Sequence, residues 1–374
     1  MIIVVPAESR AGERRVAATP ETVKKLSVNH SVLVQAGAGV GASIPDAAFA
    51  DAGAKLIASA AEIYQQADIL LKVRGPSADE AAALKSGSVL VGLVNPYDTS
   101  MMEIYAKRGL TAFSMEWLPR ITRAQSMDVL SSQANIAGYK AVMLAADQYQ
   151  RFIPMLMTAA GTVKAARVLV LGAGVAGLQA IATAKRLGAM IEASDVRPDV
   201  KEQIESLGAK FVDVPFETDE EREIAKGVGG YARPMPASWM KRQGAAVAER
   251  IKQADIVIST ALIPGRKAPV LITEDMVKAM KPGSVIVDMA VEQGGNCPLS
   301  ELDKIVIKHG VTLIGYSNLP TLVAADASAF YARNLLNFLA LILDPKSGAM
   351  NIDRADEIIA GSLVCADGAV VKKA

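Results

Sequence analysis

The sequence predicts an α/β protein with two Rossmann-like domains, whose parallel sheets are joined by long interdomain helices. Short apolar runs alternate with amphipathic stretches along most of the chain, a pattern typical of parallel α/β architecture. A glycine-rich turn follows one of these runs, in the segment Val168–Gly177. The chain has 374 residues, of which 51% are hydrophobic, and this is enough to fill two cores of ordinary size.

The predicted strands form two series. In the first series, helical patterns over Pro20–Ser27, Ala58–Gln66 and Asp98–Arg108 separate the apolar runs Ile2–Val5, Ser31–Gln35, Ile69–Val73, Val89–Val94 and Thr111–Ser114. The second series begins at Arg167 and includes Met190–Ser194, Lys210–Val214, Ile256–Thr260, Ser284–Asp288 and Val311–Tyr316. We therefore expect one domain from residues 1–130 with 330–374, and a second domain from residues 131–329.

Two long helical patterns mark the crossings between these domains. The first is Ser131–Phe152, for which Ser131 or Ser132 is a plausible N-cap. The second is Ala324–Leu343. The tail, Met350–Val371, is expected to return to the first domain, with Asp367-Gly368 as a hairpin turn.

Composition excludes several classes of protein. The net charge is +1, so nothing favours binding to nucleic acid or to an anionic lipid surface. The two cysteines, Cys297 and Cys365, have no metal-type spacing and give no disulfide framework. No apolar run approaches the roughly 18–20 residues of a membrane helix, and no basic leader or cleavage site precedes the first strand. We expect a soluble cytoplasmic protein without a metal, which could still have a membrane-bound partner.

The segment Val168–Gly177 has the form of a dinucleotide-binding fingerprint. Gly172 allows the tight turn, Gly174 lets the backbone approach a pyrophosphate, and Gly177 lets the helix pack closely on the strand. The pyrophosphate would lie at the N-terminus of the following helix, where backbone N–H groups point toward it. Because strand, turn and helix follow in the right order, the pattern predicts nucleotide binding.

An acidic residue follows the next predicted strand. Asp195 lies 18 residues after Gly177, where a carboxylate accepts hydrogen bonds from ribose hydroxyls and repels a 2′-phosphate. This favours NAD(H) over NADP(H). Arg197 complicates the assignment, because a nearby arginine can accommodate a 2′-phosphate. With Asp195 in place, we interpret Arg197 as lying along the adenine or facing water.

Two other segments rich in glycine have weaker patterns. A glycine cluster follows the run at Ser31, but Pro45 would break a phosphate-binding helix there, so we interpret the cluster as a structural turn. The segment Glu217–Pro236 is too long and polar for a simple connection. It is either a disordered loop or a lid, with Gly229 and Gly230 as hinges and Tyr231 as the closing side chain.

Few side chains are placed to transfer a proton. A dehydrogenase needs a general acid or base at the reacting carbon, most often His or Lys. The two histidines, His30 and His309, are expected at the surface, and Lys72 at the end of a strand is the better candidate. This shortage suggests a reaction that needs no proton transfer, such as hydride passing directly between two nicotinamide rings.

The segment Arg120–Ser131 is the other unusual stretch. Arg120, Gln125, Asp128 and Ser131 could converge to hold a carboxamide at the start of the long helix. The alternative is an ordinary capped helix entrance with a surface pair of arginine and aspartate, which contributes little to stability. The pattern alone leaves both interpretations open.

The motif Pro119-Arg-Ile-Thr-Arg-Ala-Gln-Ser-Met-Asp128, followed by Leu130-Ser-Ser-Gln-Ala-Asn-Ile-Ala-Gly-Tyr139, resembles the NAD(H)-binding component of proton-translocating NAD(P) transhydrogenases. The resemblance covers essentially the whole chain. Further matching motifs are Thr158-Ala-Ala-Gly-Thr162, Gly230-Tyr-Ala232, Thr260-Ala-Leu-Ile-Pro-Gly265 and Gly294-Gly-Asn-Cys297. Pro6-Ala-Glu8 and Glu13-Arg-Arg-Val-Ala17 are shared with alanine dehydrogenases.

This resemblance implies a set of site residues. It assigns Arg120, Asp128 and Ser131 to the nicotinamide carboxamide and its surroundings, and Gln125 to the partner nucleotide. The remaining nucleotide contacts that it implies are Arg123, Gly172, Ala173, Gly174, Val175, Gly177, Asp195, Val196, Arg197, Gly230, Tyr231, Gln243 and Leu262. Gly230 and Tyr231 would belong to a mobile loop that folds over the nucleotide.

The resemblance also implies partners. These are an NADP(H)-binding domain or beta subunit and membrane subunits that translocate protons, with this chain as a homodimer attached peripherally to the inner membrane. Two alternatives remain. An alanine dehydrogenase shares positions resembling Arg15 and Lys72 but needs a histidine after the strand at Val89, where this chain has Leu93-Val-Asn-Pro96. A non-catalytic NADH sensor would need only the fingerprint and a lid.

Overall fold

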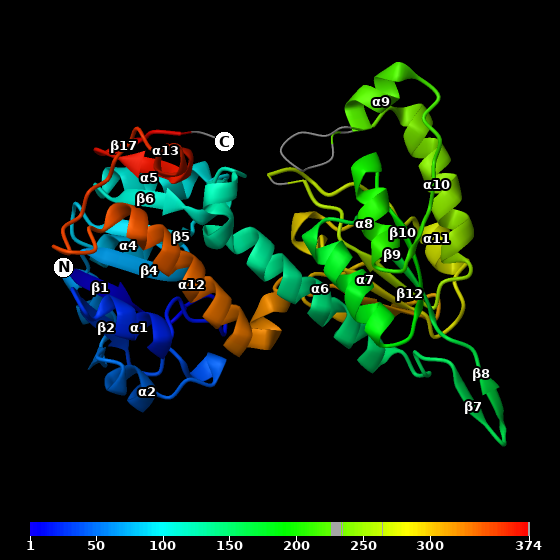
Figure 1. Ribbon diagram of the computed structural model, residues 1–374, viewed down its shortest axis with the longest axis horizontal. Helices are drawn as coiled ribbons and strands as arrows, with labels where there is room; N and C mark the ends of the chain where they lie inside the picture. The colour runs from blue at the N-terminus through cyan, green and yellow to red at the C-terminus, as the bar shows by residue number, and fades with distance from the viewer. Residues whose placement is uncertain (226–232, 234, 264, 373–374) are drawn as a thin grey trace. The chain divides into compact units, whose positions relative to one another are not determined.

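The computed structural model describes residues 1–225, 233, 235–263 and 265–372 (Figure 1). The chain divides into two compact units, Met1–Gln133 with Pro320–Ala374 and Ala134–Leu319. Each unit contains one large, mostly parallel sheet with helices packed on it. The prediction of an α/β protein with two Rossmann-like domains is therefore confirmed.

The first unit is built on an eight-stranded sheet with the order β17-β16-β6-β5-β4-β1-β2-β3. Its parallel strands are β1 (Ile2–Val5), β2 (Ser31–Gln35), β3 (Lys55–Ile57), β4 (Ile69–Arg74), β5 (Val89–Leu93) and β6 (Thr111–Ser114). The helices between them are α1 (Pro20–Leu26), α2 (Asp46–Asp51), α3 (Ala60–Gln66), α4 (Ala78–Ala83) and α5 (Thr99–Lys107). Such helical crossovers are what parallel pairing requires.

Alternating side chains of the strands fill two cores, one on each face of this sheet. Ile3 and Val5 belong to the core that includes Phe338 of α12 (Ala324–Ile342). Val4, between them, belongs to the opposite core, formed with helices α3 to α5. Both faces are therefore covered, which explains why the central strands are mostly apolar rather than alternating with polar residues.

The C-terminal tail adds two antiparallel strands to the edge of the same sheet. After α13 (Glu357–Ser362), β16 (Leu363–Ala366) pairs antiparallel with β6, and β17 (Ala369–Val370) pairs antiparallel with β16. Asp367 and Gly368 join the two strands with φ values of 54° and 75°. The predicted hairpin turn is thus confirmed, since positive φ at both positions is what a tight I′ turn needs. The antiparallel pairing departs from the expectation of purely parallel sheets.

The second unit is built on a seven-stranded sheet with the order β11-β10-β9-β12-β13-β15-β14. Its strands are β9 (Arg167–Leu171), β10 (Met190–Ser194), β11 (Lys210–Phe211), β12 (Ile256–Ser259), β13 (Val285–Asp288), β14 (Ile305–Lys308) and β15 (Val311–Ile314). All pair in parallel except β14, which pairs antiparallel with β15. The helices are α7 (Val175–Arg186), α8 (Lys201–Ser206), α9 (Asp219–Ala225), α10 (Ala237–Ile251) and α11 (Glu274–Lys278).

A long helix, α6 (Val129–Gln148), runs from the first unit into the second. Within the second unit it packs against the start of α7, because a Cβ built on Gly138 would lie 2.1 Å from the carbonyl oxygen of Ala176. Only glycine permits this approach. Among the described residues, no helix is long and apolar enough to cross a membrane.

After α6 the chain forms a small separate hairpin of β7 (Leu156–Thr158) and β8 (Gly161–Val163). All six residues of these strands are exposed, and Figure 1 shows the hairpin projecting from its unit. A two-stranded hairpin of this size has little stability of its own in water.

Candidate functional site

The turn between β9 and α7 has the geometry of a nucleotide-binding turn. Gly172 has a φ of 90°, and a Cβ there would lie 2.8 Å from Oγ1 of Thr260. A Cβ on Gly177 would lie 1.9 Å from the carbonyl oxygen of Gly172, so both glycines are required by close packing. A Cβ on Gly174 would meet no described atom within 4 Å. The backbone at Gly174 therefore faces open space, as ligand approach requires.

The helix that follows this turn is suited to an anion. Gly174 is the N-cap of α7, Val175 is its first residue, and a glycine has no side chain with which to cap the helix. The uncapped N–H groups and the helix dipole favour a phosphate at this end. Ala173 is buried, and its N–H group donates to Oδ2 of Asp195 at 2.7 Å. That N–H group therefore links the turn to the acidic residue.

Asp195 follows β10 and is saturated with hydrogen bonds. Besides Ala173, its carboxylate accepts from the backbone N, Nε and Nη2 of Arg197, each at 2.9 Å. Only 5% of the Asp195 side chain and 17% of the Arg197 side chain are exposed. The hydrogen bond that the Arg197 guanidinium donates to Asp195 raises the pKa of Arg197. Arg197 thus occupies acceptor atoms of Asp195 that the sequence analysis assigned to a ribose.

The other predicted nucleotide contacts of the second unit have varied positions. Val196 packs against an apolar cluster that includes Trp239, and Gln243 on α10 is buried with its Nε2 donating to Oγ of Ser194 at 3.3 Å. Leu262 is 37% exposed in the loop after β12. Gly230 and Tyr231 lie outside the described residues.

In the first unit, the predicted nicotinamide segment forms a compact turn. Residues Thr122–Met127 are a 3-10 helix (η3), which leads directly into α6. Arg120 and Gln125 are exposed, whereas Ala124 and Met127 are buried in the apolar core of the unit. The core therefore holds the turn and leaves its polar side chains on the surface.

Asp128 and Ser131 are hydrogen-bonded to each other at the start of α6. Oδ1 of Asp128 accepts from the backbone N of Ser131 at 2.9 Å, and Oδ2 accepts from Oγ of Ser131 at 2.6 Å. Asp128 is therefore the N-cap of α6, because an N-cap carboxylate accepts from the N–H three residues later. The prediction that Ser131 or Ser132 caps this helix is wrong.

Arg123 makes a fork with an acidic residue of its own unit. Its Nη1 and Nη2 lie 2.6 Å and 2.9 Å from the carboxylate oxygens of Asp356, the N-cap of α13. About half of the Arg123 side chain is exposed. This bidentate pair ties the 3-10 turn to the C-terminal tail, so a role for Arg123 in nucleotide binding would require the pair to open.

One residue that supports this turn was not predicted from the sequence. Asn334 of α12 donates from Nδ2 to the carbonyl oxygen of Ser126 at 2.8 Å and accepts from Oγ of Ser132 at 2.7 Å. Asn334 therefore holds the chain on both sides of Asp128, at Ser126 before it and at Ser132 after it. The signal in the sequence is a buried amide on the apolar face of a long helix, because such a group needs partners.

Lys72 is not available as a general base. It is 1% exposed, and its Nζ lies 3.0 Å from Oε1 of Glu80, 3.3 Å from Oη of Tyr64 and 3.8 Å from Oε2 of Glu8. Burial raises the pKa of Glu8, while Lys72 acts in the opposite direction. Arg15 is similarly buried. Its Nε donates to Oε1 of Glu13 at 2.8 Å, and its Nη2 donates to Oε2 at 2.6 Å.

The histidines are also poorly suited to proton transfer at a nucleotide. His309 has a φ of 53° and pairs with Glu274 at an exposed position. His30 is half-buried in a turn, its Nδ1 meets no hydrogen-bond partner among the described residues, and burial lowers its pKa. After β5, Asn95 has a φ of 52°, and its backbone N donates to the half-buried Glu116.

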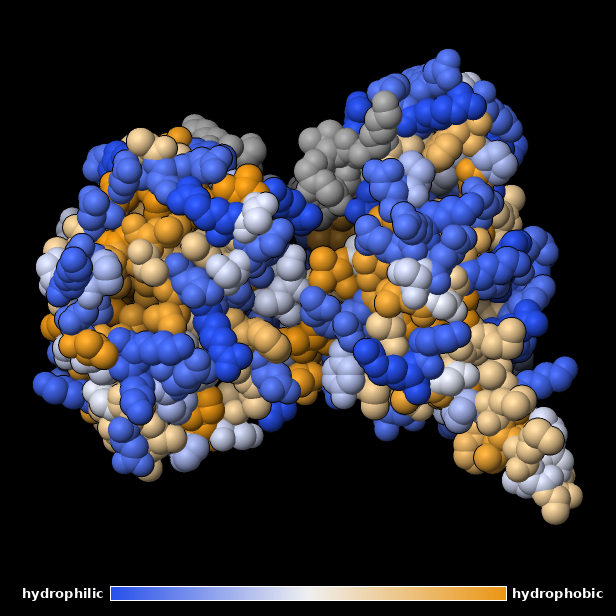
Figure 2. All heavy atoms as spheres, viewed as in Figure 1, coloured by the Kyte–Doolittle hydropathy of each residue, from blue (hydrophilic) through white to orange (hydrophobic). Residues whose placement is uncertain are grey.

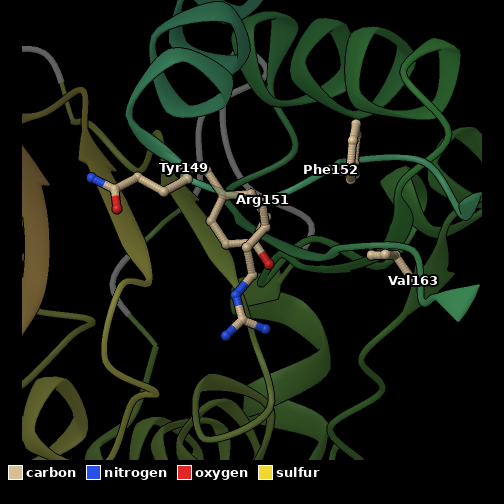
Figure 3. A pocket seen from close by; sticks show the side chains of 5 residues that line it. Tyr149, Arg151, Phe152 and Val163 are labelled. Atoms are coloured by element: carbon tan, nitrogen blue, oxygen red, sulfur yellow. The ribbon is translucent and has the colours of Figure 1, made fainter. Parts of the chain in front are cut away.

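A surface pocket lies near the base of the β7–β8 hairpin in the second unit (Figure 3). It is lined by Tyr149, Gln150, Arg151, Phe152 and Val163. The predicted nucleotide contacts are not among these lining residues. The walls combine polar side chains with the apolar Phe152, which is 56% exposed, and Val163, which is 38% exposed.

Comparison with known proteins assigns the chain to a family. Residues 4–137 match the family described as "Alanine dehydrogenase/PNT, N-terminal domain", and residues 141–373 match "Alanine dehydrogenase/PNT, C-terminal domain". An NAD(P) transhydrogenase alpha subunit from Rhodospirillum rubrum is 53% identical over 381 residues, covering 100% of this chain and 98% of that protein.

Solved structures and more distant relatives agree with this assignment. The crystal structure of transhydrogenase from Sinorhizobium meliloti has a TM-score of 0.85 and 47% identity, covering 99% of both chains. An alanine dehydrogenase from Halomonas elongata is 30% identical, covering 100% of this chain and 95% of that protein. These transhydrogenase relatives are more similar to the chain than this alanine dehydrogenase is. The chain therefore belongs to the alanine dehydrogenase/PNT family, and within this family it is more similar to the transhydrogenase alpha subunits than to the alanine dehydrogenase.

Proposed function

We propose that this chain is the NAD(H)-binding component of a proton-translocating NAD(P)+ transhydrogenase. It gives hydride from bound NADH directly to NADP+ on a partner domain, and membrane subunits couple this step to proton translocation. The observation that carries the proposal is the combination of an intact nucleotide turn at Gly172–Gly177 with Asn95 at the position where an alanine dehydrogenase needs a histidine.

The nucleotide half of this proposal is supported by the second unit. Gly174 borders open space at the uncapped start of α7, which suits a pyrophosphate. Asp195 is linked to the same turn through Ala173, where a carboxylate suits the adenosine ribose. The 53% identical relative carries NAD(P) transhydrogenase in its name.

The chemical half is supported by the first unit. We propose that Arg120, Asp128 and Ser131 orient the nicotinamide and that Gln125 meets the partner nucleotide. Arg120 and Gln125 are exposed, so they are accessible to a second protein. Hydride transfer between two nicotinamide rings moves no proton, so it needs no general base. The chain would serve mainly to hold the reacting carbons together, and such positioning can supply several kcal/mol of the barrier.

A homodimer attached to membrane subunits through the NADP(H)-binding partner is the proposed assembly. The apolar β7–β8 hairpin supports self-association, because Leu156 is 37% exposed and Met157 is 72% exposed. Figure 2 shows the hairpin as mostly hydrophobic. Exposed apolar patches of this kind mark protein interfaces.

Reconstitution tests this function. The purified chain is mixed with the NADP(H)-binding domain of a transhydrogenase, and stopped-flow absorbance follows hydride transfer from NADH to an oxidised NADP analogue. We expect transfer with the mixture and none with either protein alone. An alanine dehydrogenase would instead reduce NAD+ with alanine in the absence of the partner, and an NADH sensor would bind NADH without supporting either reaction.

A further inference from the structure

The segment Gly294–Cys297 has no role in the function proposed so far. It follows β13 and the short 3-10 turn Val291–Gln293, with φ values of 91° at Gly294 and 75° at Gly295. The fully buried Asp288 accepts from the backbone N of Asn296 at 3.1 Å and of Cys297 at 3.0 Å. A Cβ on Gly295 would lie 2.7 Å from Oδ2 of Asp288. This part of the chain is therefore held in one conformation.

The side chain of Asn296, also fully buried, uses all of its hydrogen-bonding groups except one lone pair. Oδ1 accepts from Oγ of Ser259 at 2.7 Å, and Nδ2 donates to the carbonyl oxygens of Ala261 and Pro269, both at 2.8 Å. An amide has the one acceptor and two donors that these partners need. The backbone oxygen of Asn296 also accepts from Leu271 and Ile272, at 2.9 and 3.0 Å. Asn296 thus fixes both ends of the loop that follows β12.

That loop begins beside the nucleotide turn. Oγ1 of Thr260 donates to the carbonyl oxygen of Gly172 at 2.8 Å, and a Cβ on Gly172 would lie 3.1 Å from the backbone N of Ala261. Leu262, the next residue, is partly exposed. A shift of Ala261 would therefore move Leu262 relative to the turn at Gly172.

Sheet order indicates which half of a dinucleotide this loop meets. In the second unit β9 lies between β10 and β12. A dinucleotide spans the crevice at the carboxyl ends of such strands, with its pyrophosphate at the turn after the central strand. Asp195 follows β10, so the adenosine half belongs on that side. The nicotinamide half then extends over the loop after β12.

We infer that Asn296 is a positioning residue for the nicotinamide half of bound NAD(H), acting through Ala261 and Leu262 without touching the nucleotide. The inference rests on the proposed NAD(H) site. An aspartate at this position keeps the acceptor for Ser259 but has no donor for the carbonyl oxygens of Ala261 and Pro269. The loop would lose its anchor while the turn at Gly172 keeps its own contacts.

Comparing NADH with ADP tests this inference, because ADP contains only the adenosine half and its phosphates. Isothermal titration gives both affinities for the wild-type chain, Asn296→Asp and Asn296→Ser. The matched control, Ser259→Ala, removes one bond of the same network but leaves both loop anchors. We expect the Asn296 variants to bind NADH about tenfold more weakly, with ADP affinity within about twofold of wild type. The control should bind both ligands as the wild type does.

Equal weakening of NADH and ADP binding, or no weakening of either, would overturn the positioning role. A wild-type chain that binds neither ligand would instead contradict the proposed function itself. Hydrogen exchange on the wild-type chain provides a test that does not depend on the variants folding. NADH should slow exchange of the loop amides from Ala261 to Ile272 more than saturating ADP does. Equal protection by both ligands would also overturn the inference.

Discussion

At the scale of single residues, we expect Asp195 and Arg197 to decide which nucleotide binds. A carboxylate offers about four lone-pair sites, and Asp195 already accepts four hydrogen bonds. Ribose hydroxyls can therefore bind Asp195 only by replacing the Nε and Nη2 donors of Arg197. The displaced guanidinium would then stand near the 2′ position, where it would favour a phosphate. The two residues thus act in opposite directions on selection against NADPH.

We predict that Asp195→Asn weakens NADH binding by about 1.5–3 kcal/mol, because the ribose loses a charged acceptor. The preference for NADH over NADPH should shrink in parallel. Arg197→Ala should keep or strengthen NADH binding and weaken NADPH binding further. Fluorescence titration of both nucleotides measures this, with Lys201→Ala as a control that removes a nearby exposed cation. Equal affinities of the wild-type chain for NADH and NADPH would contradict the role of Asp195.

A second prediction concerns Asp128, which has both a structural and a proposed chemical role. Asparagine caps a helix as well as aspartate does, so Asp128→Asn should retain α6 while removing the charge. We expect hydride transfer to slow by at least about tenfold, which is about 1.4 kcal/mol, with NADH affinity nearly unchanged. Arg120→Ala should behave in the same way.

Stopped-flow transfer and equilibrium NADH titration, measured on the same preparations, separate the two effects. Thr122→Ala is the matched control, because Thr122 is exposed in the same 3-10 turn. If Asp128→Asn and Arg120→Ala lost rate and affinity in equal proportion, these residues would be binding contacts without a separate effect on the reacting geometry.

At the scale of elements, the sequence predicted the long buried strands better than the edges. Runs such as Val89–Leu93 are apolar throughout and bounded by turns, so their pattern alone identifies them. The edge strands β3 and β14 have three and four residues and were not predicted. Their pairing depends on tertiary neighbours. The start of α6 was misplaced because Asp128, Ser131 and Ser132 are all good N-cap residues, and sequence alone does not rank them.

The candidate site, like the fold, could be predicted only in part from the sequence. Glycine spacing identified the turn, because each glycine has a distinct steric reason. Two ion pairs could not be predicted, because the rotamer of an arginine depends on its three-dimensional neighbours. These are the pairs of Arg197 with Asp195 and of Arg123 with Asp356. The contacts of the amides Asn296 and Asn334 could not be predicted, because their partners lie far away in the sequence.

The strand–turn–helix element contains two glycines that we expect to be needed for different reasons. Gly177 is needed for packing of the fold, and Gly174 is needed for approach of the ligand. Gly177→Ala places its Cβ 1.9 Å from a backbone oxygen, so we predict a loss of stability of about 1–3 kcal/mol. Gly174→Ala places its Cβ in open space at an ordinary φ of −74°, so stability should remain close to wild type. NADH affinity of Gly174→Ala should nevertheless fall by at least about tenfold, because the methyl group enters the pyrophosphate space.

Urea unfolding and NADH titration on both variants check this pair. Gly244→Ala serves as the control, since its Cβ would also meet no described atom within 4 Å and it lies in α10. Normal NADH binding by Gly174→Ala would mean that the pyrophosphate does not approach this backbone.

At the scale of the whole molecule, the β7–β8 hairpin is the feature whose stability the rest of its unit accounts for least. Its six strand residues are exposed, and no third strand pairs with it in the part of the chain that the structure describes. A hairpin of this size is at best marginally stable alone, so a partner surface would account for its order. A second copy of the chain is the partner that the proposed dimer supplies.

We predict that the wild-type chain is a dimer at micromolar concentration and that Met157→Asp weakens the dimer by at least about tenfold. Burying a methionine contributes roughly 1.5–3 kcal/mol, and a buried unpaired carboxylate would add a further penalty. Met190→Asp is the matched control, because Met190 is a comparably exposed methionine, at 59%, on β10 of the same unit. Sedimentation velocity over a dilution series measures both variants.

Since the turn at Gly172 lies in a separate element, monomeric Met157→Asp should still bind NADH. A wild-type chain that sediments as a monomer, or a Met190→Asp effect equal to that of Met157→Asp, would mean that the hairpin is not the dimer contact.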